Sequence, residues 1–170
     1  MIGQIVGIVG FIFLGISNLV KTRKKIILFQ VLSCLIFSIH YFLLGAMTAC
    51  ILNLIGVLRG IMFYNKKENN KKYISYFVFY ILLYLLVGVI TYDNIFSIFP
   101  IIAYILYTIS VFNEKEVIMK IINLFISFMW LIYDFSYFSY GGIISDISMI
   151  ITGIIGIFIL TRKQKLERYD

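Results

Sequence analysis

Seven long apolar stretches, separated by short polar or basic segments, constrain the fold of this chain more than any other feature. They cover residues 2–20, 26–44, 46–64, 73–92, 95–112, 117–138 and 141–160. Each is close to the roughly 20 apolar residues with which a helix crosses the hydrocarbon layer of a bilayer. The stretches are continuously apolar and do not alternate with period two, so helices are expected and a membrane barrel is not. We therefore predict an all-α membrane protein with seven transmembrane helices, in which Gly45 makes the turn between the second and the third.

The composition argues against a soluble domain and against nucleic acid as a partner. Hydrophobic residues make up 62% of the 170 residues and charged residues only 14%, which is more apolar surface than a soluble domain of this size can bury. The formal net charge is +7, but the basic residues lie in clusters between apolar stretches. Such clusters are typical of cytoplasmic loops and attract anionic lipid. The expected surroundings are a lipid bilayer, and no nucleic-acid partner is expected.

The basic residues also predict the orientation of the chain in the membrane. Fourteen of the fifteen follow the first, third and seventh stretches or flank the start of the sixth: Lys21, Arg23, Lys24, Lys25, Lys66, Lys67, Lys71, Lys72, Lys115, Lys120, Arg162, Lys163, Lys165 and Arg168. The turns on the opposite side contain none. Because cytoplasmic loops retain Lys and Arg, we expect an external amino terminus and a cytoplasmic carboxyl terminus. The first residues lack the basic region of a secretory signal, so the first helix is expected to remain in the mature protein.

An internal repeat organises the predicted helices. Shifting the chain by 93 residues without a gap places the first three stretches on the last three. The shift aligns Ser17 with Ser110, Gln30 with Asn123, Phe37 with Trp130, Phe42 with Phe135, Asn53 with Asp146 and Gly60 with Gly153. Two three-helix units of the same orientation need one inverting helix between them, as the charge pattern also requires. We predict two parallel three-helix bundles joined by a linker helix (3+1+3): a first bundle at 1–64, a basic loop and linker helix at 65–94, a second bundle at 95–160 and a basic tail at 161–170.

The second and third stretches carry residues that resemble a known family. The segments 30–33 (QVLS), 37–40 (FSIH), 44–46 (LGA) and 53–59 (NLIGVLR) are similar to the signature of the YgjV-like bacterial inner-membrane proteins. The resemblance covers most of the chain, although its sharpest motif lies in these two helices. It implies a location in the bacterial cytoplasmic (inner) membrane.

The 3+1+3 plan also resembles that of the SWEET sugar carriers and other PQ-loop transporters, and that of the nicotinamide riboside carriers. In SWEET-like proteins an Asn on the third helix of each bundle faces a central site, and aromatic residues on the second helices close it. The resemblance implies that Asn53, Asp146, Phe37 and Trp130 bind the substrate. The chain departs from this pattern because Asp146 replaces an Asn, the Pro-Gln dipeptide is missing and the single proline, Pro100, lies in the fifth helix. These departures leave the solute open.

The four residues of this predicted site also have structural interpretations. A carboxyl at Asp146 is costly in a bilayer unless it faces a cavity, a partner or a proton, but it could also be protonated and simply packed. Asn53 could contact a solute or form an ordinary hydrogen bond between helices. Phe37 and Trp130 could pack in the core or form a stacking wall for a ring-shaped solute. The functional interpretation is favoured for Asp146 and, through its pairing with Asp146, for Asn53, whereas both interpretations stay open for Phe37 and Trp130.

Three further ionisable residues are candidates for a gate or a proton-linked role. Arg59 lies five residues before Tyr64, so its side chain is expected to reach the cytoplasmic interface, and a gate or a contact with an acidic solute is the alternative. His40 and Asp134 are expected near the external ends of the second and sixth helices. We interpret both as interfacial polar residues, with a proton relay as the alternative because imidazole titrates near neutral pH.

The sequence favours a carrier over a scaffold or an enzyme. It contains no Ser/His/Asp set, Cys/His pair, phosphate loop or hydrolase-type carboxylate pair, so we expect no enzyme, no cofactor and no metal. The leading hypothesis is alternating-access transport of a small solute that is sugar-like or nucleoside-like, with a pH dependence that Asp146→Asn abolishes. The alternative is a non-transporting scaffold or accessory subunit that presents its basic loops to lipid or to a partner. A small enzyme acting on lipids ranks third, and the oligomeric state, including a homo-oligomer, is open.

Overall fold

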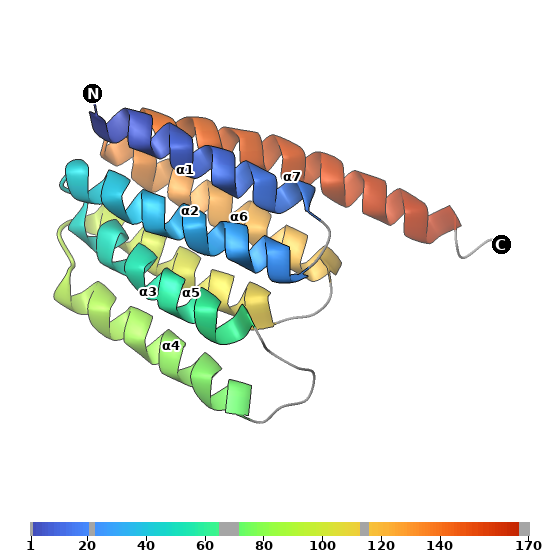
Figure 1. Ribbon diagram of the computed structural model, residues 1–170, viewed down its shortest axis with the longest axis horizontal. Coiled ribbons are helices and arrows are strands. Elements are labelled where there is room, and N and C mark those ends of the chain that lie inside the picture. Colours follow the sequence, from blue (N-terminus) through green and yellow to red (C-terminus); the bar gives the residue numbers. More distant parts are fainter. Residues whose placement is uncertain (1, 21–22, 65–71, 113–115, 167–170) are drawn as a thin grey trace.

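Helices make up almost all of the structure, a computed structural model that describes residues 2–20, 23–64, 72–112 and 116–166 (Figure 1). Within these residues there are seven α-helices and one short 3-10 helix, η1. They are α1 Ile2–Leu19, α2 Arg23–Leu43, α3 Met47–Tyr64, α4 Lys72–Ile90, η1 Ile95–Ser97, α5 Ile98–Phe112, α6 Glu116–Ser136 and α7 Tyr140–Leu166. The seven predicted helices therefore form, with ends that differ from the predicted ones by a few residues.

The apolar surface of these helices is suited to lipid. Four described segments are long and apolar enough to cross a membrane: Lys24–Leu43, Met47–Tyr64, Tyr73–Ile90 and Ile95–Phe112. The other three helices contain shorter apolar segments, which are Ile2–Ser17, Ile121–Ser136 and Tyr140–Ile155. Many large apolar side chains point outward, for example Val89 with an exposed fraction of 77%. In water such a surface would be unfavourable, whereas lipid tails solvate it.

Six of the helices pack side by side in a closed ring, and α4 lies outside it. Around the ring, α1 contacts α2, α2 contacts α3, α3 contacts α5, α5 contacts α6, α6 contacts α7 and α7 contacts α1. The helix α4 packs against α3 and α5 (Figure 1). The first and last helices are thus neighbours although they are far apart in the sequence. This ring encloses the interior in which the predicted site residues lie.

Two turns at the same end of the ring have the same backbone structure. Gly45, between α2 and α3, has φ of +76°, and Phe138, between α6 and α7, has φ of +51°. They are the described residues with a left-handed backbone, and they are 93 positions apart. In each turn an amide bonds a carbonyl five residues earlier over 2.9 Å: Ala46 N–H to Tyr41 O, and Ser139 N–H to Asp134 O. The predicted turn at Gly45 is confirmed, and the offset read from the sequence recurs in the backbone.

The ends of the helices separate the two sides of the bundle. The carboxyl ends of α1, α3, α5 and α7 lie at one end, and the amino terminus lies at the other (Figure 1). The end that holds these carboxyl ends is the one to which the sequence assigns the basic residues. Six of the fourteen basic residues behind the orientation prediction lie outside the described residues: Lys21, Lys66, Lys67, Lys71, Lys115 and Arg168. The division into residues 1–64, 65–94, 95–160 and 161–170 stays a prediction.

Candidate functional site

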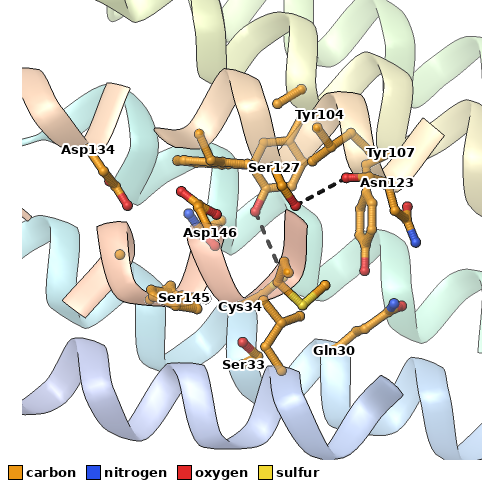
Figure 2. Close-up of a pocket in the computed structure, with 18 of the residues that line it drawn as sticks. Gln30, Ser33, Cys34, Tyr104, Tyr107, Asn123, Ser127, Asp134, Ser145 and Asp146 are labelled. Carbon is orange, nitrogen blue, oxygen red and sulfur yellow. Dashed lines mark hydrogen bonds between the residues drawn. The ribbon is translucent and has the colours of Figure 1, made fainter. Parts of the chain in front are cut away.

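A cavity of about 100 Å³ lies inside the ring, and Figure 2 shows the side chains that line it. All six ring helices contribute to its lining, and among the described residues α4 contributes none. A buried water needs about 10–15 Å³, so the cavity has room for several waters or one small solute. A small polar molecule can therefore be accommodated in it.

Many of the residues that line the cavity form pairs that are 93 positions apart in the sequence. Seven lining residues come from α1, α2 and α3, and the residue 93 positions after each of them also lines the cavity. The pairs are Leu14 with Tyr107, Gln30 with Asn123, Ser33 with Ile126, Cys34 with Ser127, Phe37 with Trp130, Tyr41 with Asp134, and Asn53 with Asp146. Equivalent positions of the two halves of the chain thus face one common space.

The predicted pair Asn53 and Asp146 lies in this cavity, on α3 and α7. Both side chains are buried, with exposed fractions of 3% and 7%. The Asn53 amide donates to the Ala49 carbonyl over 2.9 Å, so one of its ends is held by its own helix. The Asp146 carboxyl has a buried oxygen, Oδ2, without a hydrogen-bond partner among the described residues. An unpaired polar atom of this kind costs about 1–3 kcal/mol, which a bound group can offset.

The aromatic residues form a stack with a member that the sequence did not predict. Tyr41 stacks on Trp130 with ring centroids 5.4 Å apart and on Phe37 with centroids 6.0 Å apart. Phe37, Trp130 and Tyr41 all line the cavity. The offset of 93 could have identified Tyr41, because it aligns this residue with Asp134.

Asp134 and His40 are buried, with exposed fractions of 1% and 0%. The Tyr41 hydroxyl donates to Asp134 Oδ1 over 2.8 Å, which joins α2 to α6. Both residues lie near the ends of their helices, as expected, but their side chains are buried inside the protein and are not exposed at its surface. Asp134 lines the cavity together with Asp146, and His40 does not.

His40 links α2 to α1 and to the turn before α7, at the end of the bundle that holds the amino terminus. Its Nδ1 lies 2.7 Å from the Gly3 carbonyl and its Nε2 lies 2.7 Å from the Ser139 hydroxyl. A carbonyl only accepts, so Nδ1–H donates, and in the neutral ring Nε2 accepts from Ser139. A Cβ on Gly7 would come within 2.8 Å of the imidazole ring, so the glycine makes room for it.

Gly142 makes room for the Asp134 carboxyl in the same way. A Cβ at this position would lie 1.6 Å from Asp134 Oδ2 and 2.6 Å from the Ser139 hydroxyl. No side chain fits there unless the carboxyl turns away and gives up its bond to Tyr41. The residue 93 positions earlier is Ala49, which is fully buried.

Arg59 is also buried, with an exposed fraction of 2%, and does not reach the surface as expected. Its Nη1 donates to the Thr108 hydroxyl over 3.1 Å, and its guanidinium carbon lies 4.3 Å from the ring centroid of Tyr107. The interpretation as an interfacial anchor is therefore wrong, because aromatic rings hold the cation inside the protein. Arg59 lies beside the central cavity, in a small pocket that shares Gln30, Cys34 and Tyr107 with it.

The cavity has two chemically different ends (Figure 2). Asp134, Asp146 and Ser145 lie toward one end, and Gln30, Asn123 and Tyr107 lie toward the other. Gln30 and Asn123 were aligned by the repeat but were not predicted as site residues. Within the described part of the chain, no three His, Cys, Asp or Glu side chains gather as metal ligands would. The site offers carboxyls, amides, hydroxyls and aromatic faces, which are groups that can form hydrogen bonds to a polar organic molecule and stack on it.

The chain belongs to a family of bacterial inner membrane proteins, Imp-YgjV, whose model matches residues 1–164. This confirms the resemblance to YgjV-like proteins and identifies the chain as a bacterial inner membrane protein. No curated protein and no solved structure matches the chain.

Proposed function

We propose that this inner membrane protein is a carrier that moves a small polar solute by alternating access. In this proposal residues 1–64 and 95–160 form two parallel three-helix bundles, α4 connects them, the amino terminus is external and the carboxyl terminus is cytoplasmic. Asn53 and Asp146 contact the solute from the two bundles, and Phe37 and Trp130 form its aromatic walls. Rocking of one bundle against the other exposes the site to each side in turn.

The observation that supports this proposal is the cavity whose lining repeats every 93 residues. Structural repeats with a substrate site at their common interface are a recurrent plan of secondary transporters. The contacts around the ring follow the same plan, since the contact of α1 with α7 corresponds to that of α5 with α3. A scaffold has no need of a polar cavity in its interior, whereas a carrier requires one. The plan also resembles that of the PQ-loop and SWEET carriers.

Hydrogen bonds connect the two proposed bundles at the end that holds the amino terminus. Tyr41 bonds Asp134, and His40 bonds Ser139. The Gln4 amide donates to the Phe138 carbonyl over 2.9 Å. These contacts would form an external gate that has to open when the site faces outward. The described conformation is then an outward-closed one.

Uptake by reconstituted vesicles tests the proposal. Purified protein in vesicles is offered a panel of labelled sugars, nucleosides, amino acids and amines. We expect uptake of at least one solute above protein-free vesicles, and a loss of roughly tenfold or more in Asp146→Asn and Asp146→Leu, because a charge-assisted hydrogen bond contributes about 1.5–3 kcal/mol. Asp93→Asn is the matched control, since Asp93 is an exposed carboxyl that pairs with Tyr137 away from the cavity.

The same vesicles separate the two titrating candidates. If proton binding at Asp146 accompanies transport, uptake depends on pH and Asp146→Asn removes the dependence. A dependence that survives Asp146→Asn but is lost in His40→Gln would assign the proton to the external gate. If no solute is taken up and Asp146→Leu inserts and functions in cells as the unchanged protein does, the scaffold is the better account.

A further inference from the structure

We propose that the solute is a small organic cation, an amine or a quaternary ammonium compound with a polar tail. This inference rests on the proposed carrier function and specifies the substrate class of the same cavity. The carboxyls of Asp146 and Asp134 supply the counter-charge, aromatic rings enclose the cationic head, and the amides of Gln30 and Asn123 bind the tail.

The charges of the lining are the first argument. Asp134 and Asp146 line the cavity, and no described lining residue is a Lys, Arg or His. A buried carboxylate is strongly unfavourable without a partner, so it must bind either a proton or a cation. Asp146 is more than nine-tenths buried, and its Oδ2 has no partner among the described residues. The protein thus provides negative groups to the cavity without providing their positive partners.

Arg59, a buried cation beside the cavity, does not fill this role. Arg59 donates to Thr108 and to the Tyr104 carbonyl, over 3.1 and 3.4 Å, and does not line the central cavity. Its guanidinium packs against the rings of Tyr107 and Tyr104, at 4.3 and 5.5 Å from their centroids. The same two tyrosines also line the cavity. They show that aromatic groups of this interior already hold one positive charge.

The aromatic wall is the second argument. Tyr41 and Trp130 stack beside the carboxyls, and Trp130 meets Tyr104 edge to face with centroids 5.8 Å apart. The faces of Trp and Tyr attract ammonium groups, most strongly where water is excluded. Carboxyl groups next to such rings select a cation over a neutral molecule of the same shape. An anionic solute would face two carboxyls.

The two ends of the cavity define the rest of the solute. The carboxyls and the amides lie toward opposite ends (Figure 2). A molecule with a charged head and a hydroxyl or carbonyl tail satisfies both ends at once. A cavity of about 100 Å³ suits a small molecule of this kind.

The single tryptophan provides a direct test, because Trp130 is the only one in the chain and lines the cavity. Full-length protein in detergent is titrated with choline, tetramethylammonium and ethanolamine while Trp130 emission is recorded. Choline is paired with 3,3-dimethylbutan-1-ol, which has the same shape without the charge. We expect a saturable change with at least one cation, and a roughly tenfold weaker response to the neutral isostere.

Variants assign the response to the carboxyl. Asp146→Asn, which keeps the shape of the side chain, should weaken the cation response roughly tenfold or more, and Asp93→Asn should leave it unchanged. Equal responses to choline and its neutral isostere would overturn the inference, and so would no response to any of the cations. If the protein takes up neutral solutes only, and Asp146→Asn abolishes this uptake, the cationic substrate class is overturned and the carrier function is supported. Saturable cation binding without uptake of any solute would keep the cation site and reject the carrier.

Discussion

The two halves of the cavity lining occupy equivalent positions but differ in chemistry. The first half contributes Tyr41 and Asn53, which are neutral, and the second half contributes Asp134 and Asp146 at the same positions. The repeat therefore determines where a side chain lies, and individual substitutions determine what it does. As a result both acids lie on one side of the proposed interface between bundles. The two halves of the lining thus match in position and differ in charge.

The two halves also differ in the space that they provide for an acidic side chain. Asp134 fits because position 142 is a glycine, whereas the equivalent position 49 is an alanine beside a helix that carries Tyr41. Arg59 is another difference, since Thr152 is its counterpart. Each half therefore contains local adjustments that follow from its own ionisable residues. Mutations that swap or remove these side chains test whether the two halves are equivalent in position but different in chemistry.

Exchanging the central polar pair has the largest expected effect. Asp146→Asn alone should reduce uptake roughly tenfold or more, because the carboxyl is lost. Adding Asn53→Asp returns a carboxyl to the cavity from the other half, and we expect the double variant to recover most of the uptake. Asn53→Asp alone adds a third buried acid and should not raise uptake. A double variant as inactive as Asp146→Asn would show that the two positions are not equivalent.

Removing the space at Gly142 should destabilise the second half. The Cβ of Gly142→Ala would overlap Asp134 Oδ2, so the carboxyl must turn away from Tyr41. We expect a free energy of unfolding lower by about 2 kcal/mol, measured by thermal unfolding in detergent. Gly153→Ala on the same helix is the control, because its Cβ would meet Leu124 at an ordinary 3.6 Å. If the loss persists in an Asp134→Ala background, crowding of Asp134 is not its cause.

The His40 link should have a smaller effect, which is confined to the gate. His40→Gln cannot bond both Gly3 and Ser139 as the imidazole does, so unfolding free energy should fall by about 1 kcal/mol. Ser139→Ala removes the same contact from the other side. The two changes together should cost less than their sum, because they share one interaction. Strict additivity would mean that the bond between them contributes nothing.

The two turns should show the smallest effects, of opposite sign. Gly45→Ala forces a Cβ into a left-handed backbone and should cost about 1 kcal/mol. Phe138→Gly relieves that strain at an exposed position and should be neutral or stabilising by a few tenths of a kcal/mol. Thermal unfolding of both variants compares them. Equal destabilisation by both changes would show that the side chain of Phe138 has a separate role.

The sequence predicted the helices and the pairing of their polar positions well, because both are recorded in linear patterns. Apolar length defined the helices, and the offset of 93 aligned Gln30 with Asn123 and Asn53 with Asp146, which all line the cavity. The same offset would have identified Tyr41 through Asp134. The alignment alone does not mark Tyr41 as a site residue, because a tyrosine and an aspartate differ in chemistry.

The sequence failed where a side chain's direction depends on packing between distant helices. Arg59 is close enough to the end of its helix to reach the surface, yet Tyr104, Tyr107 and Thr108 of α5 hold it inside. His40 is likewise held by Gly3 and Ser139, from α1 and the turn before α7. No local pattern records that α1 and α7 are neighbours. Such contacts become visible only once the ring has closed.

Alternating access to the cavity is the central claim, and the native Cys34 tests it most directly. This half-buried thiol lines the cavity, and Cys50 is the other cysteine of the chain. In a Cys50→Ala background, Cys34 is labelled with a membrane-impermeant thiol reagent in right-side-out and in inside-out vesicles. The account predicts labelling from both sides, with faster labelling from the external side when His40→Gln weakens the gate. Labelling from one side only, unchanged by His40→Gln, would contradict alternating access and with it the carrier.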